Sequence, residues 1–130
     1  MPTAGPRHPL TRLAPRPSSC RSRVEIDLDA LAHNLQQFGR HVHGTARVFA
    51  VVKANAYGHG AVTCAQALLG AGAARLMVAN CAEAAELRAA GIETPIHILG
   101  TLPADEMADA VELDLVPSIQ DLDQARHLST

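Results

Sequence analysis

Short apolar runs alternate with amphipathic segments along most of the chain after residue 47. The runs predict strands, and the segments between them carry apolar residues at helical spacing. The predicted strands are Val48–Lys53, Leu76–Ala79, Ile96–Leu99 and Leu113–Val116, each followed in turn by a helix, at 61–69, 81–90, 103–112 and 119–128. This alternation indicates an α/β fold with parallel strands joined by right-handed crossovers.

Cap residues mark the predicted helix ends. Asn80, with Glu83 three residues later, has the form of a capping box with Asn in place of Ser or Thr. Ser118, with Asp121 three residues later, is expected to cap the last helix. Pro117 lacks an N–H group, so it is expected at the end of the strand before that helix.

A further strand and helix are predicted before the first of these units. Residues 24–26, Val-Glu-Ile, alternate as a short strand does, and Asp27 can cap a helix after it. Apolar residues then follow at helical spacing: Leu28, Leu31, Leu35 and Phe38. Gly39 or Gly44 is expected to end this helix.

The first 22 residues differ from the rest in composition. They contain five prolines and no periodic apolar pattern, so we expect disorder, with one ordered domain over residues 23–130. The segment lacks the apolar core of a secretory signal. Its arginine and serine content without acids resembles an organellar transit peptide, although we favour a nonfunctional extension; an arginine-rich nucleic-acid arm is a weaker option.

Two architectures fit the alternating pattern. One is a doubly wound open sheet, and the other is part of a (β/α)8 TIM-type barrel. A complete barrel takes about 250 residues. The 130-residue chain would therefore hold only the N-terminal half of a barrel.

Composition narrows the classes of partner. With 48% apolar and 18% charged residues, the chain reads as globular, and no apolar run approaches the roughly 18 residues of a membrane helix. The net charge is −2, but residues 24–130 carry six basic and thirteen acidic groups. This acidic body does not favour binding to nucleic acid or to a membrane.

The cysteines indicate a reducing compartment, and we expect the cytoplasm. Cys20, Cys64 and Cys81 are odd in number, are far apart and form no CxxC motif. We expect Cys64 and Cys81 to be small core residues. No spacing of histidine, aspartate or glutamate indicates a metal site.

Lys53 is the only lysine in the chain and ends an apolar strand. Ligands bind at the carboxyl ends of parallel strands in both candidate architectures. A lysine there is partly desolvated, which favours its neutral amine, and a neutral amine can form a Schiff base or act as a general base. From position alone, a lysine that only solvates the strand end is the better interpretation.

The residues after Lys53 change that balance. Tyr57, the only tyrosine, is followed by Gly58, His59 and Gly60, which allow a tight turn before a helix. A tyrosine hydroxyl beside a helix N-terminus suits a phosphate, and an amine with a phosphate group nearby suits pyridoxal phosphate. A dinucleotide loop is disfavoured, because Thr63 replaces the third glycine of GxGxxG.

The sequence AVVKANAYGHG, residues 50–60, resembles the cofactor-lysine signature of the alanine racemases. Three other stretches are similar to that family: VEIDLDALAHN (24–34), RLMVANCAEAAELRAAGI (75–92) and PIHILG (95–100). The resemblance covers roughly residues 23–128 and leaves out the N-terminal extension.

The resemblance implies an enzyme, an isomerase with a pyridoxal-phosphate barrel that interconverts L- and D-alanine for cell-wall peptidoglycan. Lys53 would bind the cofactor and serve as one acid/base, and Tyr57 would hydrogen-bond its phosphate. In the family, the second acid/base is a tyrosine of the partner subunit in a homodimer. Tyr57 is the only tyrosine here, so we expect the isolated chain, as a fragment, to be inactive.

Two other functions stay open. One is a barrel enzyme for another amino acid, a racemase or a decarboxylase, although NAYGHG disfavours the decarboxylases. The other is a noncatalytic half barrel. Among the histidines, we expect His59 to make a structural loop hydrogen bond. His97 either faces the cofactor or is a satisfied core residue, and we favour the second.

Overall fold

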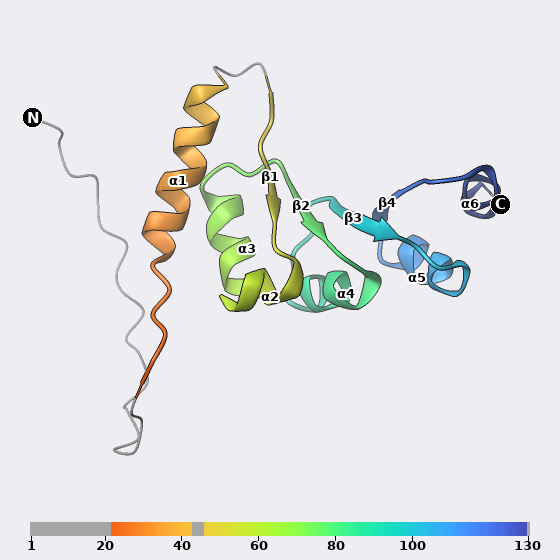
Figure 1. Ribbon diagram of the computed structural model, residues 1–130, viewed down its shortest axis with the longest axis horizontal. Coiled ribbons are helices and arrows are strands. Elements are labelled where there is room, and N and C mark those ends of the chain that lie inside the picture. Colours follow the sequence, from red (N-terminus) through yellow and green to blue (C-terminus); the bar gives the residue numbers. More distant parts are fainter. Residues whose placement is uncertain (1–21, 43–45, 130) are drawn as a thin grey trace, which may run out of the picture.

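The computed structural model describes residues 22–42 and 46–129 (Figure 1). The predicted disordered extension, Ser22 apart, and Gly44 lie outside these residues. The helices are α1 (Leu28–His41), α2 (Lys53–Gly58), α3 (Ala61–Gly70), α4 (Cys81–Ala89), the 3-10 turn η1 (Ala104–Glu106), α5 (Met107–Glu112) and α6 (Leu122–Leu128). The strands are β1 (Phe49–Val51), β2 (Arg75–Val78), β3 (Ile96–Thr101) and β4 (Leu115–Ser118).

The four strands form one parallel sheet in the order β1-β2-β3-β4, which confirms the predicted α/β alternation. Each new strand is added on the same side of the previous one, as Figure 1 shows. Right-handed crossovers then place all connecting helices on one face of the sheet. A doubly wound sheet would reverse direction and cover both faces, so this arrangement favours the half barrel.

The burial of alternate strand residues distinguishes the two faces. On β1, Ala50 is buried, whereas Phe49 and Val51 are more than a third exposed. The same alternation holds along β2 and the first half of β3. The buried positions pack under the helices and form the core together with residues such as Leu68, Ala84, Leu87 and Ala110. The opposite face of the sheet is the one that would face a barrel interior, and we call it the inner face.

Residues 24–26 are not a strand, contrary to the prediction. Val24 is 85% exposed, and the segment extends from the start of α1 away from the sheet (Figure 1). Alternation alone cannot make a strand where no neighbouring backbone offers hydrogen bonds. Asp27 does cap α1, because its carboxylate accepts a 2.9 Å hydrogen bond from the N–H of Ala30. Gly39 does not end the helix, which continues to His41.

The apolar stripe of α1 is only partly used. Leu35 is buried, and Leu28 and Leu31 pack against the core from its edge. Phe38, predicted to belong to the same stripe, is 65% exposed. The helix therefore contacts the rest of the molecule through its first two turns more than through its last.

The last unit begins later than predicted. Strand β4 starts at Leu115, because Asp114 takes a left-handed turn (φ 49°) after α5. Ser118 ends the strand, and its hydroxyl donates a 2.7 Å hydrogen bond to the carbonyl of Ile98. The cap of α6 is instead Asp121, which accepts from the N–H of Gln124 at 2.8 Å. Pro117 lies inside β4, at the edge of the described sheet, where a missing N–H is tolerated.

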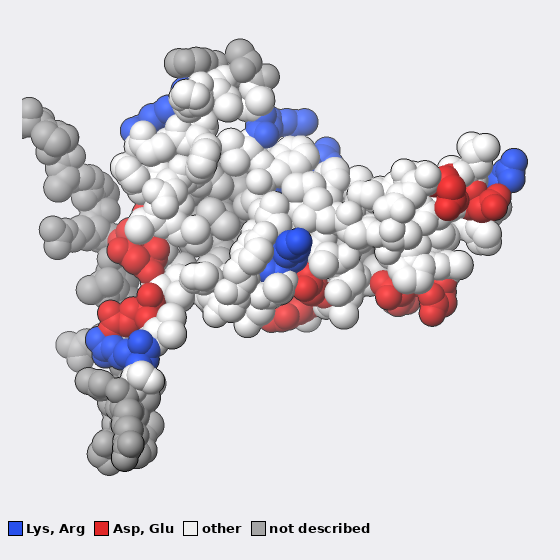
Figure 2. Space-filling view, in the orientation of Figure 1, with Lys and Arg blue, Asp and Glu red and all other residues white. Residues whose placement is uncertain are grey.

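The face of the molecule shown in Figure 2 carries no large basic area among its described residues. On the face shown in Figure 2, acidic and basic side chains are scattered, mostly around the rim of the molecule. Over residues 22–42 and 46–129, none of the helices combines the length and the apolar composition needed to cross a bilayer.

Candidate functional site

Lys53 lies at the carboxyl end of β1, as predicted. The N–H of Val52 donates to the carbonyl of Met77 at 2.9 Å, so pairing with β2 continues up to the residue before the lysine. Lys53 is the first residue of α2 and follows Val52, whose ψ of 19° ends the extended backbone of the strand. The side chain is half-buried. The amine thus leaves the sheet at the edge where parallel α/β folds bind ligands.

The residues after Lys53 form a left-handed turn that was not predicted. Ala54, Asn55, Ala56 and Tyr57 all have φ between 50° and 56°. Left-handed backbone costs about 1–2 kcal/mol for each such residue, and it normally occurs singly. Strained backbone of this kind clusters at active sites and ligand clamps. Alanine and tyrosine carry no sequence signal for positive φ, so only the family signature could have found this turn.

Hydrogen bonds of Asn55 and His59 stabilise the end of the left-handed turn that leads into α3. The side-chain oxygen of Asn55 accepts from the N–H of Ala61 at 2.7 Å, which caps α3 from six residues earlier. The ring Nδ1 of His59 donates to the carbonyl of Ala56 at 2.8 Å. The predicted structural loop hydrogen bond of His59 is therefore confirmed. Gly60, with φ 95°, completes the tight turn before the helix.

Glu83, on α4, stabilises the start of the left-handed turn, next to Lys53. One carboxylate oxygen accepts from the N–H of Ala54 at 2.8 Å, and the other accepts from the N–H of Ala79 at 2.8 Å. The N–H of Glu83 donates to the side chain of Asn80 at 3.0 Å, which confirms that half of the predicted capping box. The reciprocal bond differs from the prediction, because the carboxylate binds Ala79 and Ala54 and not the N–H of Asn80.

Tyr57, the predicted phosphate donor, has an exposed side chain. Its side chain is 60% exposed, and within the described part of the chain its hydroxyl has no hydrogen-bond partner. Lys53 and Tyr57 are the first and fifth residues of α2, which precedes α3.

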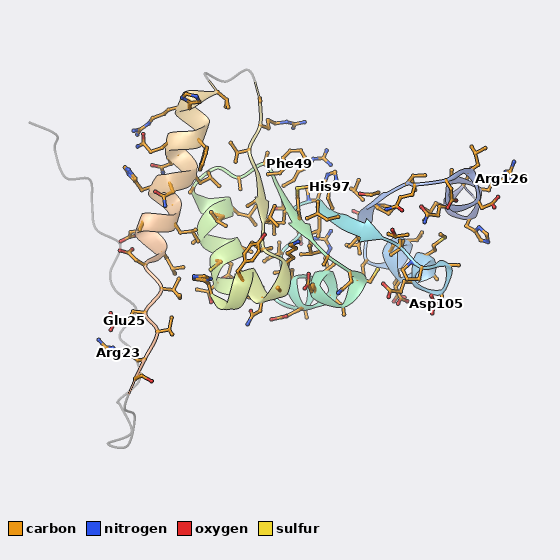
Figure 3. The ribbon with its side chains drawn as sticks, in the orientation of Figure 1. Arg23, Glu25, Phe49, His97, Asp105 and Arg126 are labelled. Carbon is orange, nitrogen blue, oxygen red and sulfur yellow. The ribbon has the colours of Figure 1, made fainter. Side chains whose placement is uncertain are left out.

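His97 belongs to a cluster on the inner face, farther from the carboxyl end. Its Nε2 accepts from a guanidinium nitrogen of Arg75 at 2.9 Å, and its ring lies 5.4 Å from the ring of Phe49 (Figure 3). The guanidinium also lies 5.7 Å from the Phe49 ring centre. Burial, and then the positive charge of Arg75, lower the pKa of His97. His97 is thus a histidine with satisfied contacts.

Neither of the two cysteines in the described residues, Cys64 and Cys81, offers a nucleophile. Cys64 and Cys81 are buried, as predicted, and carry free thiols. Burial raises the pKa of Cys64. Burial, and then the neighbouring Glu106, raise the pKa of Cys81 to about 11. Both thiols therefore stay protonated near neutral pH and act as core residues.

The arrangement supplies one amine and one free phenol hydroxyl beside a braced turn at the carboxyl end of a parallel sheet. Residues 22–42 and 46–129 contain no group of three or more histidine, cysteine, aspartate or glutamate side chains placed to hold a metal ion. The chemistry on offer is covalent capture of a carbonyl and hydrogen bonding to an anion.

Comparison with known proteins gives the same family from sequence and structure. The family model for the N-terminal domain of alanine racemase matches residues 26–130. The alanine racemase of Desulforamulus reducens is 43% identical over 106 residues, which are 82% of this chain and 29% of that protein. Alanine racemase from E. faecalis is similar in structure, with a TM-score of 0.76 and 35% identity over 81% of this chain and 28% of that one.

A racemase for another amino acid is also similar. Histidine racemase from Leuconostoc mesenteroides has a TM-score of 0.72 and 29% identity, over 78% of this chain and 27% of that one. The chain spans less than a third of the length of each of these three relatives. The parallel sheet is therefore the N-terminal half of the barrel found in these enzymes. The chain belongs to the alanine racemase family.

Proposed function

We propose that the whole protein carrying this chain is a pyridoxal-phosphate enzyme that interconverts L- and D-alanine. The observation that carries the proposal is Lys53, the only lysine, placed at the carboxyl end of β1 and held by a strained, braced turn. Membership of the alanine racemase family supports the proposed reaction, and the position of Lys53 at the carboxyl end of β1 supports its role as the cofactor lysine. We place the enzyme in the cytoplasm, where its product D-alanine would be used for the synthesis of cell-wall peptidoglycan.

The residues present fit this cofactor. Its aldehyde needs a primary amine, and Lys53 offers one at the ligand-binding edge of the sheet. Its phosphate needs donors, and the exposed hydroxyl of Tyr57 offers one four residues further along the chain. When bound, pyridoxal phosphate supplies an electron sink for the pair of electrons left on the substrate α-carbon.

Lys53 would have two tasks in turn. Its Nζ would hold the cofactor by its aldehyde. Nζ would also serve as the acid/base that takes a proton from one side of the substrate α-carbon or returns it. Tyr57 keeps its hydrogen bond to the phosphate throughout, so the reacting atoms stay in place.

Racemisation also needs an acid/base on the opposite side of the α-carbon. In the family this group is a tyrosine of the partner subunit, and Tyr57, the only tyrosine of this chain, is assigned to the phosphate. We infer that it comes from the partner subunit of a homodimer. The 130 residues alone would then supply one proton-transfer group and no racemase activity.

A second candidate function is racemisation of a different amino acid. The similarity to a histidine racemase favours this alternative, because it shows that the N-terminal half fits more than one kind of racemase. The substrate side chain would be selected by parts of the protein outside residues 1–130.

Growth of a bacterium that requires D-alanine tests the proposal. The whole reading frame carrying this chain should restore growth without added D-alanine, and the same frame with Lys53→Ala should not. Residues 1–130 alone should also fail. The purified protein is then offered a panel of L-amino acids. Racemisation of another amino acid with none of alanine would transfer the proposal to the second candidate.

A further inference from the structure

We propose that Glu83 is a positioning residue for Lys53, acting through the backbone on which the lysine stands. The inference rests on the proposed role of Lys53. Glu83 lies in the first turn of α4, 29 residues after Ala54 in the chain, yet its carboxylate accepts the Ala54 N–H at 2.8 Å. That N–H belongs to the peptide that joins Lys53 to Ala54.

The bond restrains the lysine because the peptide unit is planar. Fixing the Ala54 N–H fixes the plane of the Lys53–Ala54 peptide, and with it the backbone on which the Lys53 side chain starts. The second oxygen of Glu83 holds the Ala79 N–H at 2.8 Å, at the end of β2. One carboxylate therefore joins the ends of two neighbouring strands, and the lysine leaves from the first of them.

The strain in the turn explains why such a bond is needed. The four left-handed residues, Ala54 to Tyr57, would relax toward ordinary backbone if nothing held them. The bond of His59 lies within the loop, and the bond of Asn55 joins the turn to the start of α3. Backbone bonds tie Val52 to β2 and Ala56 to Val52, and the carboxylate of Glu83 adds a side-chain tie between the Lys53–Ala54 peptide and the end of β2. Hydrogen bonds to a charged acceptor are about twice as strong as neutral ones, which suits this role.

Two features of α4 favour this position of the Glu83 carboxylate. The side chain of Asn80 caps α4 and holds the backbone N–H of Glu83 at 3.0 Å. The carboxylate also lies at the positive end of the helix dipole, where a negative charge is favoured. Among the described residues Lys53 makes no ion pair with Glu83, so the influence passes through the Ala54 amide and not through a direct charge contact.

Hydrogen exchange of single amides in the full 130-residue chain tests the proposal without any cofactor. In Glu83→Ala, the amides of Ala54 and Ala79 should exchange at least about tenfold faster than in the wild type, since a charge-assisted bond is lost. Glu83→Gln has one acceptor oxygen in place of two, so one of the two amides should lose protection. Glu86→Ala, exposed on the same helix, is the matched control and should change neither.

Reaction of Lys53 with pyridoxal phosphate gives the second readout. After borohydride reduction, the rate of labelling at Lys53 should fall about tenfold in Glu83→Ala and less in Glu83→Gln. Asn80→Ala weakens the start of α4 and keeps the carboxylate, so it distinguishes lost stability from lost positioning. It should lower the denaturant midpoint of unfolding and slow labelling less than Glu83→Ala does.

The outcomes separate the two proposals. Wild-type exchange of Ala54 in folded Glu83→Ala, or of both Ala54 and Ala79 in folded Glu83→Gln, would overturn the role of Glu83. If Glu83→Ala does not fold, the Glu83→Gln variant decides. If the whole wild-type protein carrying this chain gives no label at Lys53, the proposed cofactor role is contradicted, and the exchange of Ala54 still decides whether Glu83 holds the turn.

Discussion

Helix α4 has a charged side chain near each end, and each binds backbone groups at one edge of the sheet. At the carboxyl edge, Glu83 accepts from two N–H groups and holds a strained turn. At the amino edge, Arg88 donates to the carbonyls of Ile92, Thr94, Leu113 and Asp114, at 2.7 to 3.0 Å. Both charges also suit the helix dipole at their own end.

The difference lies in what the bonds hold. Arg88 joins the loops that lead into β3 and β4, and those carbonyls would otherwise need other donors. Glu83 holds residues whose backbone costs free energy and whose neighbour is Lys53. In barrels of this kind the carboxyl edge carries function and the amino edge carries stability. A single helix of nine residues here serves both edges.

The largest expected effect on stability is at Arg88. Arg88→Ala removes the donors of four carbonyls, and we expect it to lower the free energy of unfolding by about 2–4 kcal/mol. Denaturant unfolding measures this. Arg126→Ala breaks only an exposed ion pair with Asp123 and should cost less than about 1 kcal/mol. Equal effects of the two variants would contradict the account of the amino edge.

The inner face should control association of the isolated chain. Its exposed residues include Val51 and Leu99, 37% and 39% exposed, beside the open edges of β1 and β4. Such surfaces favour association, so sedimentation should show dimers or larger species. Val51→Thr with Leu99→Gln should reduce association, whereas Val111→Gln on α5 should not. A monodisperse wild-type monomer would count against this prediction.

A smaller effect is expected at Gly100, on the β3 side of the carboxyl edge. A Cβ there would lie 2.8 Å from the carbonyl oxygen of Ala79, whose N–H is bound to Glu83. Gly100→Ala should therefore cost about 1–3 kcal/mol of stability. Gly39→Ala in α1 meets nothing within 4 Å and should stabilise the chain by up to about 1 kcal/mol. Thermal unfolding of both variants checks the pair, and a stabilised Gly100→Ala would refute the close approach.

The smallest effect concerns pH. The pKa of His97 is lowered from its ordinary 6.5, so below pH 6.5 the unfolded chain takes up a proton that the folded chain resists. The contribution of His97 to stability is therefore constant above this pH and falls as the pH drops below it. His97→Leu should flatten this slope. Arg75→Leu should flatten it less, because burial is the larger cause of the shift. Identical slopes in wild type and His97→Leu would contradict the assignment.

The sequence predicted the elements whose signals are local. Apolar runs located the four strands, and Asp27 and Asn80 were recognised as caps from the residues beside them. Prediction failed where a distant partner decides. Residues 24–26 alternate without a neighbouring strand, and Ser118 bonds to Ile98 and does not cap a helix.

The residues of the candidate site also divide into those that the local sequence indicates and those that depend on a distant partner. Lys53 and Tyr57 could be selected because each is the only residue of its kind and the two lie four positions apart. The contribution of Glu83 could not be predicted, because its bond to Ala54 spans 29 residues and the sequence pattern indicates only a helix-capping role for it. The left-handed turn was equally hidden, since alanine, asparagine and tyrosine give no common signal for positive φ. Arg88 likewise binds carbonyls of loops that only the folded chain brings together.

The most direct test of the account is the site of attachment of pyridoxal phosphate. The whole protein carrying this chain is incubated with the cofactor, reduced with borohydride, digested and mapped by mass spectrometry. We predict a pyridoxyl group on Lys53, and a loss of it when the protein is unfolded before the cofactor is added. A folded protein that carries the label elsewhere, or none at all, would contradict the claim that the turn at the carboxyl edge presents Lys53 to this cofactor.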